Sequence, residues 1–259
     1  MIVHEATAQY MNFRSKNFAY STKMFAEFID QVGRGEKLYL RSLSAEKPTE
    51  LPADISKDFP SIANDFRLPT ALALITENAH SCPLRISGPV IMWLHYDVSL
   101  HLMSLVSANI CQVMANVLCQ IKGQKRLLLF PPSDVKHLGF EAGASSSSIN
   151  MFDSQTPIPG NTHPHEALLN PGDVLFLPPL WLHTALPISG MSVAVNVFFR
   201  NLQSGYAVGK DVYGNRDLKA YEKGRQDVAK IVKSFDGLPA DVRGFYLQRL
   251  VKEFEERAC

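Results

Sequence analysis

The sequence predicts a mainly β protein, an antiparallel barrel or sandwich, with an N-terminal helix and two C-terminal helices. From residue 84 to residue 200, short apolar runs alternate with turn residues, as in VIMWLHYD, KRLLLF, DVLFLPP and MSVAVNVFF. This pattern is typical of antiparallel β domains. After residue 215 the apolar residues recur at helical spacing instead, which indicates helices.

The segment before the predicted barrel contains one helix and one strand. Residues 20–32 place apolar side chains at helical spacing, Ser21 or Thr22 is available as the N-cap, and GRG ends the helix. Residues 38–43 alternate as a strand does, and residues 44–69 are rich in Pro, Asp and Ser, which predicts irregular structure. Within the barrel, KGQK and NPGD are turn signals.

The C-terminal segment predicts two amphipathic helices separated by the sequence GLP at residues 237–239. Their apolar stripes are of the type that packs on a domain or on a partner subunit, so we expect a homodimer through these helices. The predicted organisation is an N-terminal lead-in at 1–70, a barrel at 71–204 and a helical pair at 205–259.

The amino-acid composition of the chain limits the classes of protein to which it can belong. A chain of 259 residues with 46% apolar residues can bury a full core, and a net charge of +1 shows no global preference for nucleic acid or membrane. The four cysteines lack CxxC spacing, which predicts neither a zinc ribbon nor a disulfide framework and fits a reducing compartment. Without a signal-peptide pattern or a long apolar run, the protein is expected to be cytoplasmic, with no membrane partner.

One group of residues has the pattern of a metal site. His95 and Asp97 stand two residues apart in a strand-like run, so both side chains point to one face. His183, at the end of GDVLFLPPLWLH, is the expected third ligand. Two imidazoles and one carboxylate leave the opposite side of a metal open, the facial arrangement of non-haem Fe(II) oxygenases. The alternative is that both histidines are structural and Asp97 caps a turn.

The runs HYD, NVLCQIKGQKRLLLFPPSD, NPGDVLFLPPLWLH and SVAVNVFF resemble the Jumonji-C (JmjC) hydroxylases of the cupin superfamily, over residues 20–200. The resemblance implies a double-stranded β-helix (jelly-roll) barrel that uses Fe(II) and 2-oxoglutarate. It also implies that Lys125 pairs with the distal carboxylate of 2-oxoglutarate and that Asn116 and Asn196 line the same pocket. Where the family often has Thr, three residues before the first ligand, this chain has Met92.

Within this family the chain is most similar to the C-terminal cupin modules of fungal enzymes that synthesise wybutosine in tRNA, so it is expected to be a lone module or a fragment. That similarity implies tRNA as a partner and leaves three functions open. The first is an Fe(II)- and 2-oxoglutarate-dependent oxygenase. The second is a module that assists methoxycarbonylation of the modified guanosine in phenylalanine tRNA, without hydroxylase activity. The third is a non-catalytic docking or dimerisation cupin.

Two further features bear on these alternatives. Residues 210–233 hold seven Lys/Arg against four Asp/Glu, which suits either an RNA contact or a solvated helix face. The distances from Asp97 to Asn116 and to Lys125 are both fifteen residues longer than in the relatives, which predicts an insertion, residues 98–112, directly after the second metal ligand. An insertion there interrupts a core strand, where a register error would turn side chains to the wrong face.

Overall fold

A computed structural model of the chain describes residues 1–97, 115–199 and 216–258. It divides into two compact units, Met1–Arg216 and Asp217–Cys259. The first unit is mainly β and the second is helical, so the predicted mainly β fold with N-terminal and C-terminal helices is confirmed. The boundary predicted at residue 204 and the predicted insertion at 98–112 lie outside the described residues.

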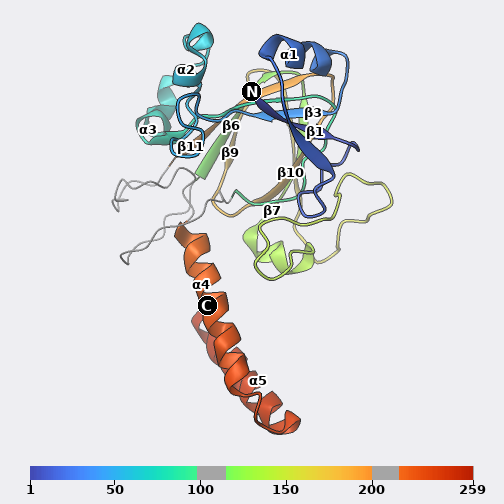
Figure 1. Ribbon diagram of the computed structural model, residues 1–259, viewed down its shortest axis with the longest axis vertical. Coiled ribbons are helices and arrows are strands. Elements are labelled where there is room, and N and C mark those ends of the chain that lie inside the picture. Colours follow the sequence, from blue (N-terminus) through green and yellow to red (C-terminus); the bar gives the residue numbers. More distant parts are fainter. Residues whose placement is uncertain (98–114, 200–215, 259) are drawn as a thin grey trace. The chain divides into compact units, whose positions relative to one another are not determined.

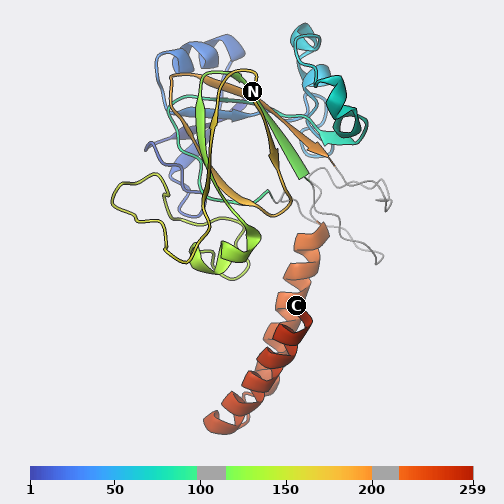
Figure 2. The same ribbon diagram turned by 180° about the vertical axis from the view of Figure 1, so that it is seen from behind.

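The β unit consists of two antiparallel sheets that enclose a common interior (Figures 1 and 2). The larger sheet contains, in spatial order, β2 (Phe18–Thr22), β1 (Ile2–Ala6), β3 (Leu38–Arg41), β5 (Leu84–Ser87), β11 (Ser192–Phe199), β6 (Ala115–Lys122) and β9 (Val174–Leu177), with β4 (Ala79–Ser81) paired to β11. The smaller sheet contains β10 (Leu182–Pro187), β7 (Lys125–Phe130) and β8 (His165–Leu169).

Successive side chains along each strand point alternately to the interior of the β unit and to its exterior. In β6, Leu118 packs with Leu127 and Leu129 of β7 between the two sheets, because side chains two residues apart share a face. Val117 and Cys119 point to the opposite face and join the core under the helices. Asn116, which has the same parity as Leu118, therefore faces the interior, and only a few per cent of its surface is exposed.

The N-terminal helix is shorter than the sequence predicted. Ser21 and Thr22 pair with β1 as part of β2, and α1 (Phe25–Gly33) begins after Met24 without a side-chain cap. The predicted N-cap at Ser21 or Thr22 is therefore wrong, because strand pairing with residues 2 and 3 takes precedence over local capping. The apolar face of α1 is nevertheless buried, through Phe28 and Val32.

The remaining short helices lie in connections of the β unit. The segment predicted to be irregular holds α2 (Ile55–Asp58) and the 3-10 turn η1 (Pro60–Ile62), and it is followed by η2 (Thr70–Leu72) and α3 (Ala73–Glu77). Ile55 and Ile75 of these elements pack into the outer core of the larger sheet. A further 3-10 turn, η3 (Pro132–His137), follows β7.

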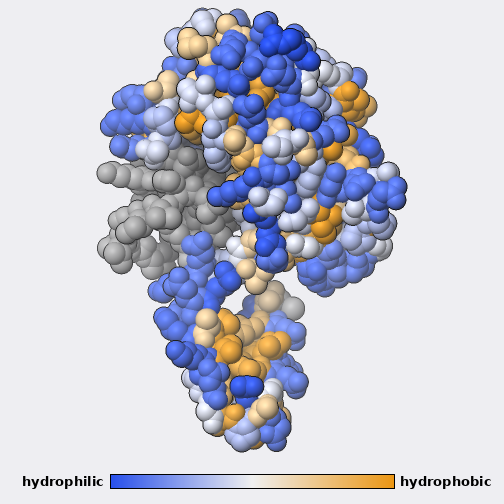
Figure 3. Space-filling view, turned by 45° about the vertical axis from the view of Figure 1, so that its right-hand side comes forward, coloured by the Kyte–Doolittle hydropathy of each residue, from blue (hydrophilic) through white to orange (hydrophobic). Residues whose placement is uncertain are grey.

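The C-terminal unit is a helical hairpin of α4 (Arg216–Ser234) and α5 (Ala240–Ala258), as predicted from the two apolar stripes. Phe235 and Tyr246 stack with ring centroids 6.4 Å apart, but no side chain of α5 is buried. Apolar side chains therefore gather on the surface of the hairpin (Figure 3). Among the described residues, no helix is both long enough and apolar enough to cross a membrane.

Candidate metal centre

Two histidines meet where the segment before Asp97 crosses β10. His95 and His183 form an isolated antiparallel bridge. The His95 N–H donates to the His183 carbonyl at 3.0 Å, and the His183 N–H donates to the His95 carbonyl at 2.7 Å. Directly paired residues on neighbouring strands project to one side, and the two imidazole centroids lie 4.4 Å apart.

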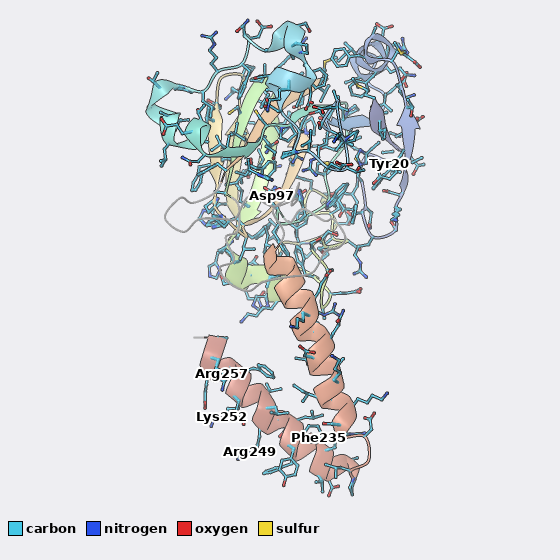
Figure 4. The ribbon with its side chains drawn as sticks, turned by 60° about the vertical axis from the view of Figure 1, so that its left-hand side comes forward. Tyr20, Asp97, Phe235, Arg249, Lys252 and Arg257 are labelled. Atoms are coloured by element: carbon cyan, nitrogen blue, oxygen red, sulfur yellow. The ribbon has the colours of Figure 1, made fainter. Side chains whose placement is uncertain are left out.

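Asp97 completes the group from the same segment as His95, two residues on. One potential ligand atom from each of His95, Asp97 and His183 lies within 4.8 Å of the others, and Asp97 Oδ2 lies 3.9 Å from His183 Nε2. The side chains of His183 and Asp97 are only 9% and 18% exposed, and Asp97 points into the β unit (Figure 4). Among the described residues, this is the cluster of three such side chains that converges closely enough to hold an ion.

Each imidazole is oriented by the carbonyl two residues before it. His95 Nδ1 lies 2.8 Å from the Trp93 carbonyl, and His183 Nδ1 lies 3.0 Å from the Trp181 carbonyl. Because a carbonyl oxygen only accepts, Nδ1 carries the hydrogen in both rings and Nε2 keeps its lone pair for a metal. The sequence Trp-Leu-His occurs at both positions, a signal for this paired arrangement that the motif search missed.

The electrostatic environment of His95 and Asp97 favours the protonation states that bind a metal. Burial, with the neighbouring charges of His183 and Arg85, lowers the pKa of His95 to about 3, which keeps its imidazole neutral. Burial alone would raise the pKa of Asp97. Electrostatic interactions of its carboxylate with the rings of His183 and His95 and with the Arg85 guanidinium, together with a hydrogen bond from Asn116, outweigh burial and lower that pKa below its ordinary value.

Asn116 and Asn196 form a hydrogen-bond chain that ends on Asp97. Asn116 Nδ2 donates to Asp97 Oδ2 at 2.9 Å, and Asn196 Nδ2 donates to Asn116 Oδ1 at 2.9 Å. An ionised carboxylate only accepts, so its position fixes the orientation of both amides. The Oδ1 atom of Asn196 is buried and has no hydrogen-bond partner among the described residues.

A comparison with protein families gives the class of this fold. The family model described as "Cupin-like domain" matches residues 3–205. The chain belongs to the cupin-like domain family. Its two antiparallel sheets thus correspond to the predicted jelly-roll architecture, although the described strands form two sheets and not one closed ladder.

This cupin is similar along its whole length to proteins named for wybutosine synthesis. It is 58% identical to the tRNA wybutosine-synthesizing protein 4 of Aspergillus fumigatus, a match that covers 100% of this chain and 26% of the relative. It is 36% identical to the tRNA wybutosine-synthesizing protein 5 of Danio rerio and 33% identical to that of Homo sapiens. Those matches cover 99% of this chain and 77% and 79% of the relatives. The cupin thus spans about a quarter of the length of its protein 4 relative.

The cupin has a small inner cavity beside the two histidines. It measures about 40 Å³ and is lined by Lys125, Arg85, His183 and Asn196, among others. Burial, followed by the charge of Arg85, lowers the pKa of Lys125 to about 7. Neither a hydrogen bond nor an ion pair joins the Lys125 side chain to the other described residues, although only 8% of the residue is exposed.

Arg85 is a site residue that the sequence reasoning missed. Its Nη1 donates to the Tyr39 hydroxyl at 2.7 Å, and it lines the inner cavity. Its Nε is buried and has no hydrogen-bond partner in the part of the chain that the structure describes. The sequence contains only a weak signal for the role of Arg85, because this residue lies in the short run LRIS and no residue spacing distinguishes an isolated arginine in a strand. Alternation in β5 would have placed it on the face opposite the buried residues Leu84 and Ile86.

A second, larger cavity shares part of its lining with the inner cavity and measures about 340 Å³. It reaches His95 and Asp97, whereas the inner cavity reaches His95 and His183. The four residues that line both cavities are Tyr39, Arg85, Met92 and His95. The triad therefore lines both a small cationic cavity and a larger one.

The residues present fit a divalent metal. Both Nε2 lone pairs and one carboxylate converge, and the Nδ1 atoms and Asp97 Oδ2 are held by hydrogen bonds. Two histidines with one carboxylate are the donor set of non-haem Fe(II) oxygenases. The predicted residues Lys125, Asn116 and Asn196 surround this triad, but the two asparagines are engaged with Asp97 and with each other.

Proposed function

We propose that this chain is an Fe(II)- and 2-oxoglutarate-dependent oxygenase module that acts on tRNA in wybutosine synthesis. The observation that carries the proposal is the position of the triad where a small cationic cavity adjoins a larger one. In this reading His95, Asp97 and His183 hold iron. Bound iron would activate oxygen at the expense of the oxo acid, with succinate and carbon dioxide as coproducts.

The chain's own residues would bind the cosubstrate by charge. Lys125 is a buried amine, protonated below its pKa of about 7 and without an anionic partner among the described residues, and Arg85 adds a fixed positive charge to the same cavity. Burying a charge is costly unless it is paired, so an entering carboxylate compensates a cost that the fold already carries. In its present shape the inner cavity takes one carboxylate, so the rest of the diacid would extend past Met92 toward the metal.

Metal binding is tested by anaerobic Fe(II) titration of the wild type and of His95→Ala, Asp97→Ala and His183→Ala. Removing one of three ligands leaves too few donors, so each variant should lose high-affinity binding. His137→Ala is the matched control, because His137 is a histidine outside the site that contacts Asn161. Equal binding by all five proteins excludes the triad as the metal site.

Cosubstrate use is tested by the succinate formed from 2-oxoglutarate with Fe(II) and ascorbate. The wild type should form succinate, and Lys125→Met should form it only at much higher 2-oxoglutarate concentration. If succinate is absent and 2-oxoglutarate does not shift the melting temperature, the oxygenase proposal is wrong.

A second candidate function is supported by the relatives. The chain is more similar to proteins named tRNA wybutosine-synthesizing protein 4 than to those named protein 5. A module that assists methoxycarbonylation of the modified guanosine would keep the fold and bind tRNA without oxidising 2-oxoglutarate. Binding of phenylalanine tRNA by a protein that forms no succinate would favour this function.

The helical hairpin is the proposed dimer interface. Phe245, Val251 and Phe254 of α5 and Val228 and Val232 of α4 are 41% to 57% exposed, because two helices packed on each other leave much of their apolar surface uncovered. A second copy would complete a four-helix bundle. Light scattering should give a dimer for the wild type and a monomer for Val251→Asp, whereas Lys252→Asp, one position on, should remain dimeric. A monomeric wild type at micromolar concentration would exclude this interface.

A further inference from the structure

The amine of Lys125 lies in a small cavity whose described walls carry no acidic side chain. The residue is only 8% exposed, and it lines the inner cavity of about 40 Å³. Neither an aspartate nor a glutamate is among the described residues that line this cavity. Arg85 lines it as well, so the charged group that acts on the Lys125 amine is another cation.

This environment makes the Lys125 amine a nucleophile. Burial, followed by the charge of Arg85, lowers its pKa to about 7, whereas an exposed lysine has a pKa of about 10.4. At about pH 7.5 an exposed lysine is therefore neutral in roughly one molecule in a thousand, and the Lys125 amine is mostly neutral. A neutral amine has the free electron pair that an ammonium lacks, so it can attack an electrophilic carbon.

The size and the walls of the inner cavity restrict the electrophile. A cavity of about 40 Å³ admits a molecule of few heavy atoms and excludes larger acyl donors. Apolar side chains form much of the wall, among them Val90, Leu127 and Leu177, so a neutral molecule enters at a lower cost than an ion does. Carbon dioxide meets these conditions, because it is small, neutral and electrophilic at carbon.

We infer that Lys125 is a carbamylation site, at which the buried amine takes up carbon dioxide reversibly. The Nζ electron pair forms a bond to the carbon, one carbon–oxygen π pair moves onto oxygen, and one Nζ proton leaves to solvent. The product is a carbamate with one negative charge, and nothing is oxidised or reduced. Carbamylation thus replaces a group whose charged form Arg85 repels by an anion that Arg85 attracts, in a buried site where such interactions are strong.

Arg85 has donors left for the carbamate. Its Nη1 donates to the Tyr39 hydroxyl, whereas its buried Nε has no hydrogen-bond partner among the described residues. A guanidinium carries five N–H donors, so the contact with Tyr39 does not exhaust them. A pairing with the carbamate therefore does not require Arg85 to give up the hydrogen bond that it already makes.

The carbamate and 2-oxoglutarate compete for the inner cavity. Each places an anionic group of carboxylate size beside Arg85, and the cavity has room for one of them. This consequence rests on the proposed function, in which Lys125 pairs with the cosubstrate and carbon dioxide is a coproduct. Accumulating carbon dioxide would then restrain further turnover.

NMR of the metal-free, full-length protein tests the inference, with bicarbonate labelled with the NMR-active isotope of carbon as the source of carbon dioxide. The wild type is compared with Lys125→Met and Lys122→Met near neutral pH, and thermal melting checks that each is folded. Lys122 is the matched control, because it is an exposed lysine at the end of β6, three residues before Lys125. The wild type and Lys122→Met should show a carbamate resonance that Lys125→Met lacks. Any resonance from the α-amino group should be the same in all three.

Chemical trapping locates the carbamate without a variant, so the inference remains testable if Lys125→Met does not fold. A trialkyloxonium salt converts a carbamate into a stable ester, and mass spectrometry of peptides from the wild type should find this ester on Lys125. The inference is wrong if the wild type and Lys125→Met give the same resonances. It is also wrong if the trapped ester is absent from Lys125.

Adding 2-oxoglutarate separates this inference from the proposed function. If 2-oxoglutarate shifts the melting temperature, it should also abolish the Lys125 carbamate resonance, and a resonance that persists would refute the shared site. A protein that forms succinate but no carbamate keeps the oxygenase chemistry and loses the modification. A protein that forms the carbamate but binds no 2-oxoglutarate supports the modification and contradicts the proposed cosubstrate.

Discussion

The hydrogen bond from Asn116 to Asp97 gives the sharpest test of how the metal centre is held. Asn116→Ala removes the donor that lies 2.9 Å from Asp97 Oδ2 and leaves Nδ2 of Asn196 without its acceptor. A hydrogen bond to a charged group contributes about 1.5–3 kcal/mol. Loss of an outer partner of a metal ligand weakens metal binding about 10- to 100-fold, which corresponds to about 1.4–2.7 kcal/mol.

The assay is anaerobic calorimetric titration with Fe(II), or with Co(II) as a stable substitute, on proteins whose folding is checked by thermal melting. Cys119→Ala is the matched control, because Cys119 lies three residues on in the same strand, is also buried and points to the opposite face. We expect weaker metal binding for Asn116→Ala and unchanged binding for Cys119→Ala. Asn116→Asp should make metal affinity fall more steeply with decreasing pH, since two adjacent carboxylates share a proton.

A folded Asn116→Ala protein that binds metal within twofold of the wild type would refute this reasoning. Asn116 would then act on the cosubstrate, as the family resemblance implies, and Asp97 would be held by the metal alone. A loss of metal affinity in Cys119→Ala as large as that in Asn116→Ala would instead attribute the effect to general loosening of β6.

Four further predictions concern Lys125, Gly123 and residues 98–112. Because burial lowers the pKa of Lys125 from 10.5 to about 7, 2-oxoglutarate affinity measured by thermal shift should fall as pH rises above 7, and the fall should be absent in Lys125→Met. By the same shift the unfolded chain holds more protons than the folded one between pH 7 and 10.5, so Lys125 should make wild-type stability rise with pH in that window relative to Lys125→Met. Gly123 has a φ of +73° and an added Cβ would lie 2.5 Å from the Met191 carbonyl, so Gly123→Ala should cost about 1–3 kcal/mol in urea unfolding, whereas Gly160→Ala, in open space, should cost little. Deleting residues 98–112 should raise the melting temperature and the metal affinity, and a deletion that lowers both would show that the segment belongs to the fold.

The sequence predicted those parts of the fold that depend on local periodicity. Alternation over two residues placed the strands, and Gly237 with Pro239 marked the turn between α4 and α5. The N-cap of α1 was missed because Ser21 and Thr22 are paired with a distant strand, an interaction that no local pattern reveals. Short helices such as α2 were not predicted, because four residues are too few to show a helical periodicity.

The residues of the candidate site also fall into two groups, those that local spacing predicts and those that only contacts between distant strands reveal. His95 and Asp97 were predictable as a pair, because their spacing alone puts them on one face. Tyr39 and Arg85 were not, because they come from β3 and β5 and meet the triad only through the order of strands in the sheet. The role of Asn116 as a donor to Asp97 also depends on a contact across nineteen residues, and family resemblance had suggested the cosubstrate as its partner.

Strand register determines whether the fifteen extra residues predicted after Asp97 disturb the site. In a strand, a shift of one residue turns every side chain to the other face, so the site requires Asn116 to keep the parity of Leu118. The pairing of β6 with its neighbouring strands sets that parity, and the number of residues before β6 does not. Asn196 of β11 pairs with Leu118, and Leu177 of β9 pairs with Asn116. The turn at Gly123 then carries the register into β7, where Lys125 pairs with Pro187, and His183 pairs with Leu129 on the same face. Extra residues between Asp97 and Ala115 are therefore compatible with an intact site as long as β6 keeps these partners. It follows that a substitution disturbing the pairing of β6 with β11 should impair metal binding more than changes within residues 98–112.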